Sequence, residues 1–164
     1  EITEVSLEDF GKNNYFEHVD YGGLQGQDNR IYIKTANPDN KGPELNLNDI
    51  KLSAVPSNPD APNGETYVTL KLKIKDDISG LTIGYVKFLD PQGKLHGYWL
   101  YPPRYNVIYF EGDPTIETEY TFKMTLPEGS APGVWGVYEI ALTDCALNTS
   151  VYDFTEIIHF EIMK

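Results

Sequence analysis

Apolar and polar residues alternate with a period of two in several stretches of the chain. In the stretch 67–75 every second residue from Val68 onward is apolar, and the residues between are Thr or Lys. The same period recurs at 120–126 and at 158–162. Successive side chains of a strand point to opposite faces, so this alternation predicts half-buried β-strands. The expected core positions are Val68, Leu70, Leu72, Ile74, Tyr120, Phe122, Met124, Leu126, Ile158, Phe160 and Ile162.

Residues that favour turns separate these stretches. Asp-Pro-Gln-Gly at 90–93 lies between two apolar runs and predicts a hairpin turn, and further breaks follow at 76–80 and 127–133. No stretch has a helical repeat of apolar residues longer than two turns. Many short strands separated by turns are typical of an all-β sandwich or barrel. The predicted strands lie near 48–54, 67–76, 81–89, 95–101, 106–111, 117–126, 134–143 and 155–163.

The first residues of the chain repeat a later segment at an offset of 135. The identical pairs are Glu4 and Glu139, Leu7 and Leu142, Asp9 and Asp144, and Asn13 and Asn148. Such a repeat favours tandem modules. In that interpretation residues 1–40 are an N-terminal β segment and linker left from a preceding module, and residues 41–164 are the following sandwich. The alternative is an N-terminal hairpin that packs onto the same sandwich.

The charge of the chain narrows the classes of partner. Its 164 residues include 13 Lys and Arg against 25 Asp and Glu, which gives a net charge of −12. An acidic surface repels phosphate backbones, so no nucleic acid is expected as a partner. No apolar stretch reaches the 18 or so residues that a membrane span needs, so no membrane insertion is expected. The beginning of the chain has no signal-peptide pattern, as in a mature form or an excised part.

The order of several motifs resembles a family of bacterial immunoglobulin-like domains. The segment 133–148 is similar to its Gly-x-Trp-x-Val strand followed by Leu-x-Asp-x-Ala-Gly-Asn, with Leu147 in place of the last Gly. Asp-Asp-Ile-Ser-Gly at 76–80 resembles its Asp-Asp-x-Ser-Gly turn, and 90–93 its hairpin. The resemblance covers residues 41–164. It implies an immunoglobulin-like antiparallel β-sandwich with Trp135 in the core.

The same resemblance implies a setting for the chain. Such domains lie between or after the catalytic domains of exported hydrolases and adhesins, where they act as spacers, stabilisers or binding elements. We therefore expect a secreted or cell-surface protein in which neighbouring domains of the same chain are the partners.

Acidic turns predict a metal site. In an immunoglobulin-like sandwich the turns after the second and sixth strands lie at one end. This would bring together the oxygen ligands that a structural Ca²⁺ prefers. Those residues are Asp76, Asp77, Asp144 and Asn148. The alternative is that these side chains only cap their own turns by accepting backbone hydrogen bonds.

An aromatic strand predicts a binding surface. Tyr98 and Leu100 point to one face of the strand near 95–101, whereas Trp99 and Tyr101 point to the other. Exposed rings on one face can stack on the sugar rings of a polysaccharide. The predicted ligand-binding residues are Trp99, Tyr101, Arg104 and Tyr105. Packing within the sheet, or contact with a neighbouring module, would also account for the aromatic side chains.

The sequence holds no motif of a known catalytic centre. Cys145 is the only cysteine, and the chain has three histidines and neither a phosphate-binding loop nor a Gly-x-Ser-x-Gly elbow. The expected function is therefore non-catalytic. The first hypothesis is an accessory or spacer module, and the alternative is a carbohydrate-binding module.

Overall fold

The described part of the chain consists of strands and the turns that join them. The computed structural model describes residues 4–8, 14–18, 37–61, 64–102, 110–154 and 158–162. The chain divides into two units, Glu1–Pro38 and Asp39–Lys164. Within the described ranges, no helix has the length and apolar character needed to cross a bilayer.

The first unit contains one β-hairpin. Strands β1 (Glu4–Glu8) and β2 (Asn14–His18) pair antiparallel and form a two-stranded sheet of their own. Glu4 lies opposite His18, and Glu8 lies opposite Asn14. A separate two-stranded hairpin is only marginally stable in water, so the sheet of the first unit is small for an independent domain.

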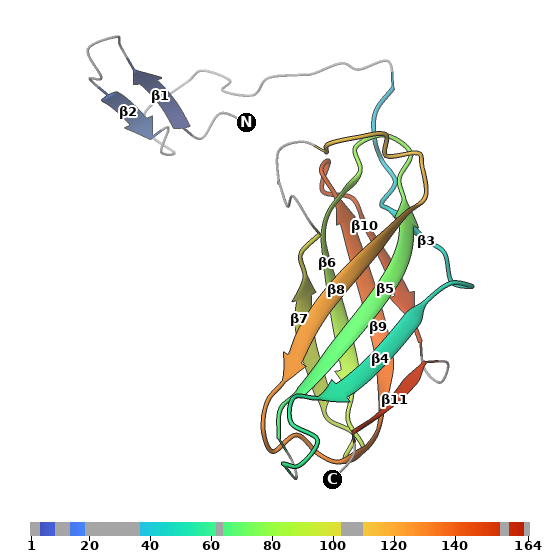
Figure 1. Ribbon diagram of the computed structural model, residues 1–164. Coiled ribbons are helices and arrows are strands. Elements are labelled where there is room, and N and C mark those ends of the chain that lie inside the picture. Colours follow the sequence, from blue (N-terminus) through green and yellow to red (C-terminus); the bar gives the residue numbers. More distant parts are fainter. Residues whose placement is uncertain are drawn as a thin grey trace. The chain divides into compact units, whose positions relative to one another are not determined.

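The second unit is a sandwich of two antiparallel sheets (Figure 1). The strands of the first sheet are β3 (Glu44–Leu45), β4 (Lys51–Pro56), β5 (Thr66–Lys75) and β8 (Thr118–Leu126). The strands of the second sheet are β6 (Leu81–Leu89), β7 (Leu95–Leu100), β9 (Gly133–Asp144), β10 (Thr149–Asp153) and β11 (His159–Ile162). In the first sheet β5 pairs with β3, β4 and β8, and in the second β9 pairs with β6, β10 and β11.

The core lies between the two sheets and confirms the predicted alternation. The apolar residues of β5 that face inward, Val68 to Ile74, are almost fully buried. Most of the other expected core positions are also buried, while Tyr120 and Ile158 are partly buried and pack against the core. Trp135 is 1% exposed, and its indole N–H donates a hydrogen bond of 2.8 Å to the carbonyl oxygen of Ala131. The prediction that Trp135 belongs to the core is confirmed.

The predicted strands differ from the structure at four places. No strand was expected at β10 or at the short β3, because neither segment has a clear alternation of its own; both are strands through their pairing with β9 and β5. Of the strand expected at 106–111, only residues 110 and 111 lie within the described ranges, and they are not in a strand. The strand expected from 155 begins at His159, and residues 155–157 lie outside the described ranges.

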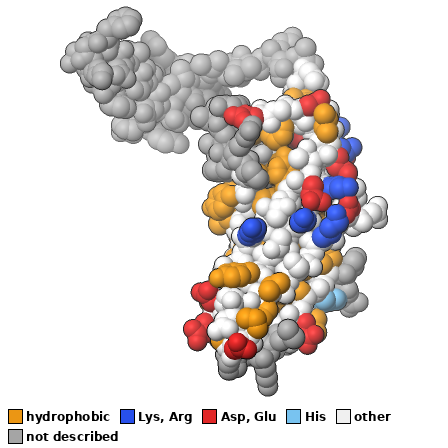
Figure 2. All heavy atoms as spheres, in the orientation of Figure 1, with side chains coloured by type: hydrophobic (Ala, Val, Ile, Leu, Met, Phe, Trp, Pro, Cys, Tyr) orange, Lys and Arg blue, Asp and Glu red, His pale blue; other side chains and the backbone are white. Residues whose placement is uncertain are grey.

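The outer face of the first sheet is charged. Figure 2 shows Lys and acidic side chains gathered over its strands. Lys51 lies 3.1 Å from both Asp49 and Glu119, and Lys71 lies 3.5 Å from Glu119. These exposed pairs each stabilise a sheet only slightly, but they keep this face soluble.

Candidate functional site

Three aspartates meet at the end of the sandwich drawn uppermost in Figure 1. Asp76 follows the last residue of β5, and Asp144 is the last residue of β9. Asp39 begins the leading segment, the name used here for residues 39–45 that run from the start of the second unit through β3. One carboxylate oxygen from each aspartate lies within 4.8 Å of the other two.

The Asp76 carboxylate holds its own turn with one oxygen only. Its Oδ2 accepts hydrogen bonds from the backbone N–H groups of Ile78, Ser79 and Gly80 at 3.1, 2.8 and 2.8 Å. The residue is only 4% exposed, and its other oxygen, Oδ1, is buried without a hydrogen-bond partner. From the sequence alone, turn capping and metal binding are alternatives. In the structure Oδ2 of Asp76 caps the turn, and Oδ1 is left over for another partner.

Asp144 and Asn148 form a second turn. Asp144 Oδ1 accepts from the backbone N–H of Asn148 at 2.7 Å, and its Oδ2 accepts from the Asn148 side-chain amide at 2.8 Å. The same amide donates to Asp39 Oδ1 at 3.1 Å. Leu147 stands where the resembled family has Gly, and it adopts a left-handed φ of 70°. The turn is therefore formed without the glycine that this conformation favours.

No cationic side chain of the described residues pairs with the three carboxylates. Among the described residues, none of the ion pairs involves Asp39, Asp76 or Asp144. Two unit charges about 4.8 Å apart repel by roughly 3 to 4 kcal/mol at an effective dielectric constant of about 20. Asp39 Oδ2 is a second buried oxygen without a hydrogen-bond partner. Each such orphaned group costs about 1 to 3 kcal/mol.

The structure brings together three of the four predicted metal ligands. Asp76, Asp144 and Asn148 are neighbours, but Asp77 is outside the group, and its carboxylate lies 3.5 Å from the Lys41 ammonium. Asp39 was not predicted, because Asn-Pro-Asp-Asn at 37–40 has the composition of a linker. Only the tertiary contacts place its carboxylate beside two turns that follow much later in the chain.

The aromatic strand β7 presents its two faces as predicted. Leu100 is fully buried, and burial raises the pKa of the Tyr98 hydroxyl. On the opposite face Trp99 is 57% exposed and Tyr101, which follows the strand, is 56% exposed. Arg104 and Tyr105, the other two predicted ligand-binding residues, lie outside the described residues.

Tyr85 on the neighbouring strand β6 extends the exposed aromatic surface. Its ring packs edge-on against Trp99, with the ring centres 4.9 Å apart and the planes at 62°. The Tyr85 ring also covers Gly97, since a Cβ atom at that position would overlap its hydroxyl end. Sequence reasoning missed Tyr85, because only the pairing of β6 with β7 brings its ring to Trp99.

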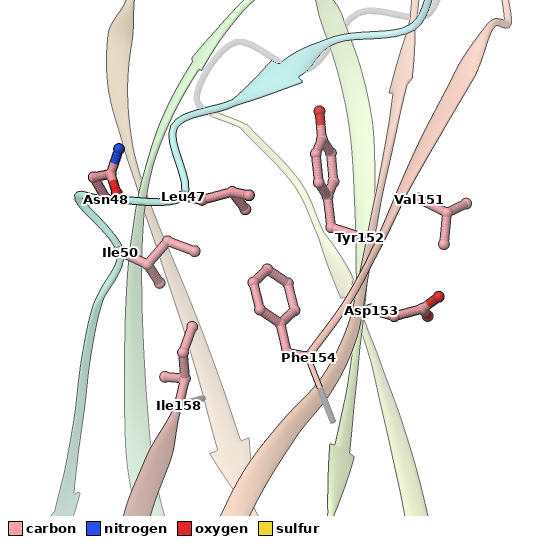
Figure 3. A pocket seen from close by; sticks show the side chains of 8 residues that line it. All are labelled: Leu47, Asn48, Ile50, Val151, Tyr152, Asp153, Phe154 and Ile158. Atoms are coloured by element: carbon pink, nitrogen blue, oxygen red, sulfur yellow. The ribbon is translucent and has the colours of Figure 1, made fainter. Parts of the chain in front are cut away.

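An apolar groove opens between the sheets, with a cavity volume of about 480 Å³ (Figure 3). Leu47 and Ile50 line one side, and Tyr152 and Phe154 line the other. Among the described lining residues, Asp153 carries the one carboxylate. The other lining residues belong mostly to the apolar edge of the core.

The Cys145 thiol and the His96 imidazole are groups of a kind that often takes part in catalysis, and each has contacts that serve the fold. Burial, and to a lesser extent the charges of Asp144 and Asp76, raise the pKa of the Cys145 thiol, which disfavours the thiolate that a nucleophile needs. His96 Nε2 lies 2.9 Å from Asp90 Oδ2, and the His96 ring packs on Trp135 with ring centres 4.8 Å apart. The hydrogen bond from His96 and those from two backbone N–H groups lower the pKa of Asp90. The pair of Asp90 and His96 thus stabilises the hairpin that joins β6 to β7.

Comparison of the chain with protein-family models, with curated proteins and with solved structures gives no match.

Proposed function

We propose that the chain is part of a tandem array of non-catalytic β-sandwich modules in a secreted or cell-surface protein, where each sandwich spaces and stabilises its neighbours. The observation that carries this proposal is a structural repeat. The hairpin of the first unit has the same pairing and register as the paired residues of β9 and β10 in the second unit, at the offset of 135 seen in the sequence.

The agreement extends to every residue pair of the hairpin. Adding 135 to β1 gives residues 139–143 of β9, and adding 135 to β2 gives 149–153, which are the bounds of β10. Glu4 pairs with His18 as Glu139 pairs with Asp153, and the remaining four pairs agree in the same way. In the sandwich, β9 and β10 belong to a larger sheet and contribute to its core. The hairpin of the first unit therefore has the form of the strands that would correspond to β9 and β10 in a preceding sandwich.

The path of the chain through the second unit suits a spacer. Asp39 lies beside Asp144, the last residue of β9, whereas Ile162 pairs with Gly133, the first residue of that strand. The chain thus enters at one end of the sandwich and leaves at the other (Figure 1). The 12 residues of β9 span about 36 Å, so each module would separate its neighbours by at least that length. The resemblance of residues 41–164 to bacterial immunoglobulin-like domains supports the same role.

Removal of residues 1–38 tests the proposal. The shortened chain should keep the urea midpoint and slope of the full chain, with a change in the free energy of unfolding below about 0.5 kcal/mol, because β1 and β2 pair with neither sheet of the sandwich. A loss of more than about 2 kcal/mol would show that the hairpin belongs to the same sandwich and would contradict the tandem array.

Carbohydrate binding is a second candidate function, favoured by the exposed rings of Trp99 and Tyr101 on one face. Affinity electrophoresis against a panel of soluble polysaccharides tests it, with Trp99→Ala as the variant. Tyr67→Ala is the matched control, since Tyr67 is also half exposed but belongs to β5 in the other sheet. If a polysaccharide slows the migration of the unmodified chain and of Tyr67→Ala, but not of Trp99→Ala, the result would support binding on β7. Equal migration in every gel would remove this candidate.

A further inference from the structure

We propose that Asp39, Asp76 and Asp144 bind a Ca²⁺ ion, and that the ion fixes the leading segment to the end of the sandwich. Asn148 acts in this site as a positioning residue. The inference does not depend on the tandem array, since all four residues belong to the second unit.

Two carboxylate oxygens of the cluster are buried without a hydrogen-bond partner. One is Oδ1 of Asp76, a residue that is more than nine-tenths buried, and the other is Oδ2 of Asp39, a residue of intermediate burial. Buried polar atoms are almost always paired, so two unpaired oxygens in one cluster indicate that a ligand completes it. Three carboxylates this close together repel one another, so the ligand that suits the cluster best carries positive charge, and no Lys or Arg within the described ranges supplies it.

The width of the cluster suits Ca²⁺. Two oxygens bound to one Ca²⁺ at about 2.4 Å lie at most about 4.8 Å apart. The three carboxylates of the cluster satisfy this limit without any movement, because their oxygens lie within 4.8 Å of one another. Mg²⁺ binds oxygen at about 2.0 to 2.1 Å and demands a tighter octahedron, so it fits a cluster of this width less well.

Asn148 holds the ligands in place. Its amide nitrogen donates to Asp144 at 2.8 Å and to Asp39 at 3.1 Å, so it bridges two like charges. The amide oxygen therefore does not face the carboxylates, and the residue orients the ligands instead of binding the ion itself. The free oxygens number fewer than the six to eight that Ca²⁺ takes, so water completes the coordination.

The position of Asp39 gives the site a consequence for the chain. Asp39 is the first residue of the second unit, and the rest of the leading segment is held further along, where Tyr152 bonds to Pro43 and Leu45. Between these two anchors lies Lys41, whose side chain is 72% exposed. A bound ion would hold the Asp39 end, so that both ends of this stretch are fixed on the sandwich and its motion is limited.

Calorimetric titration of the metal-free full chain with CaCl₂ tests the proposal. We expect one site per chain with a Kd of about 10⁻⁵ to 10⁻³ M, and a weaker response to MgCl₂. Asp39→Asn should weaken binding at least about tenfold, because it removes one of three negative ligands. Asp77→Asn is the matched control: it makes the same change in charge one residue from Asp76 but outside the cluster, and binding should stay within about threefold.

Cleavage at Lys41 provides a second readout. A lysine-specific endoproteinase that does not itself need Ca²⁺ should cut after Lys41 at least about fivefold more slowly when Ca²⁺ is present, since the ion holds this stretch closed. Asp77→Asn also removes the ion pair with Lys41, so each variant is compared with itself in the presence and absence of Ca²⁺. The ratio of the two cleavage rates should fall to about one in Asp39→Asn and stay as in the unmodified chain in Asp77→Asn. The proposal is overturned if the unmodified chain shows neither binding heat nor protection in 10 mM Ca²⁺, at about ten or more times the expected Kd. Equal loss of binding in the Asp39 and Asp77 variants would also overturn it.

Discussion

One tyrosine hydroxyl connects the leading segment to the second sheet. The Tyr152 hydroxyl accepts a hydrogen bond of 3.0 Å from the backbone N–H of Leu45 and donates one of 3.0 Å to the carbonyl oxygen of Pro43. Both of these residues are buried. Figure 3 shows the Tyr152 ring on the wall of the apolar groove with its hydroxyl directed toward the leading segment. Tyr152→Phe removes this oxygen and leaves the ring in place.

The expected cost follows from the two backbone groups that lose their partner. A buried N–H or C=O without a hydrogen bond costs about 1 to 3 kcal/mol, and part of this is recovered because the hydroxyl no longer needs to be buried. We expect Tyr152→Phe to lower the free energy of unfolding by about 2 to 3 kcal/mol. The ring makes the same contacts in both proteins, so loss of packing adds little.

Urea unfolding of the two proteins measures the effect. Tyr120→Phe is the matched control: Tyr120 is also partly buried, but its hydroxyl makes no hydrogen bond with the described residues, and the change should be below about 0.5 kcal/mol. If Tyr152→Phe costs no more than this control, the leading segment is not held by the hydroxyl and the reasoning is refuted.

Three further changes test other features of the sandwich. Gly42→Ala should cost about 1 to 3 kcal/mol in urea unfolding, because the new Cβ would lie 2.6 Å from the backbone nitrogen of Ser150; an unchanged midpoint would contradict this close approach. Leu147→Gly should stabilise the protein by roughly 0.5 kcal/mol, since Leu147 has a left-handed φ of 70° and is 75% exposed; a lower melting temperature would contradict it. Asp90 has a lowered pKa, so its contribution to stability is present above the unfolded pKa near 4 and is lost as the pH falls through the folded pKa. Between pH 5 and pH 3 the unmodified chain should therefore lose more stability than Asp90→Asn, and equal losses would contradict the assignment.

The candidate site shows where prediction from sequence ends. Asp76 and Asp144 could be found because each lies at the end of a strand whose alternation is clear: Asp76 directly follows β5, and Asp144 is the last residue of β9. The same reasoning included Asp77, since sequence position cannot distinguish two neighbouring carboxylates that point in different directions. It omitted Asp39, which lies 37 positions before Asp76 in a stretch that has no alternation.

By itself the sequence determined that the chain forms half-buried strands, which faces they bury and where they turn, because alternation and turn chemistry act between residues close in the chain. It also contained the repeat at an offset of 135, since the two copies keep similar residues at matching positions. Only the tertiary structure decided that β10 is a strand, that Tyr85 covers Gly97 beside Trp99, and that Asp39 joins two distant turns. Each of these depends on pairing between segments far apart in the chain. Such pairing is selected by the packing of the whole core, and no short stretch of sequence records it.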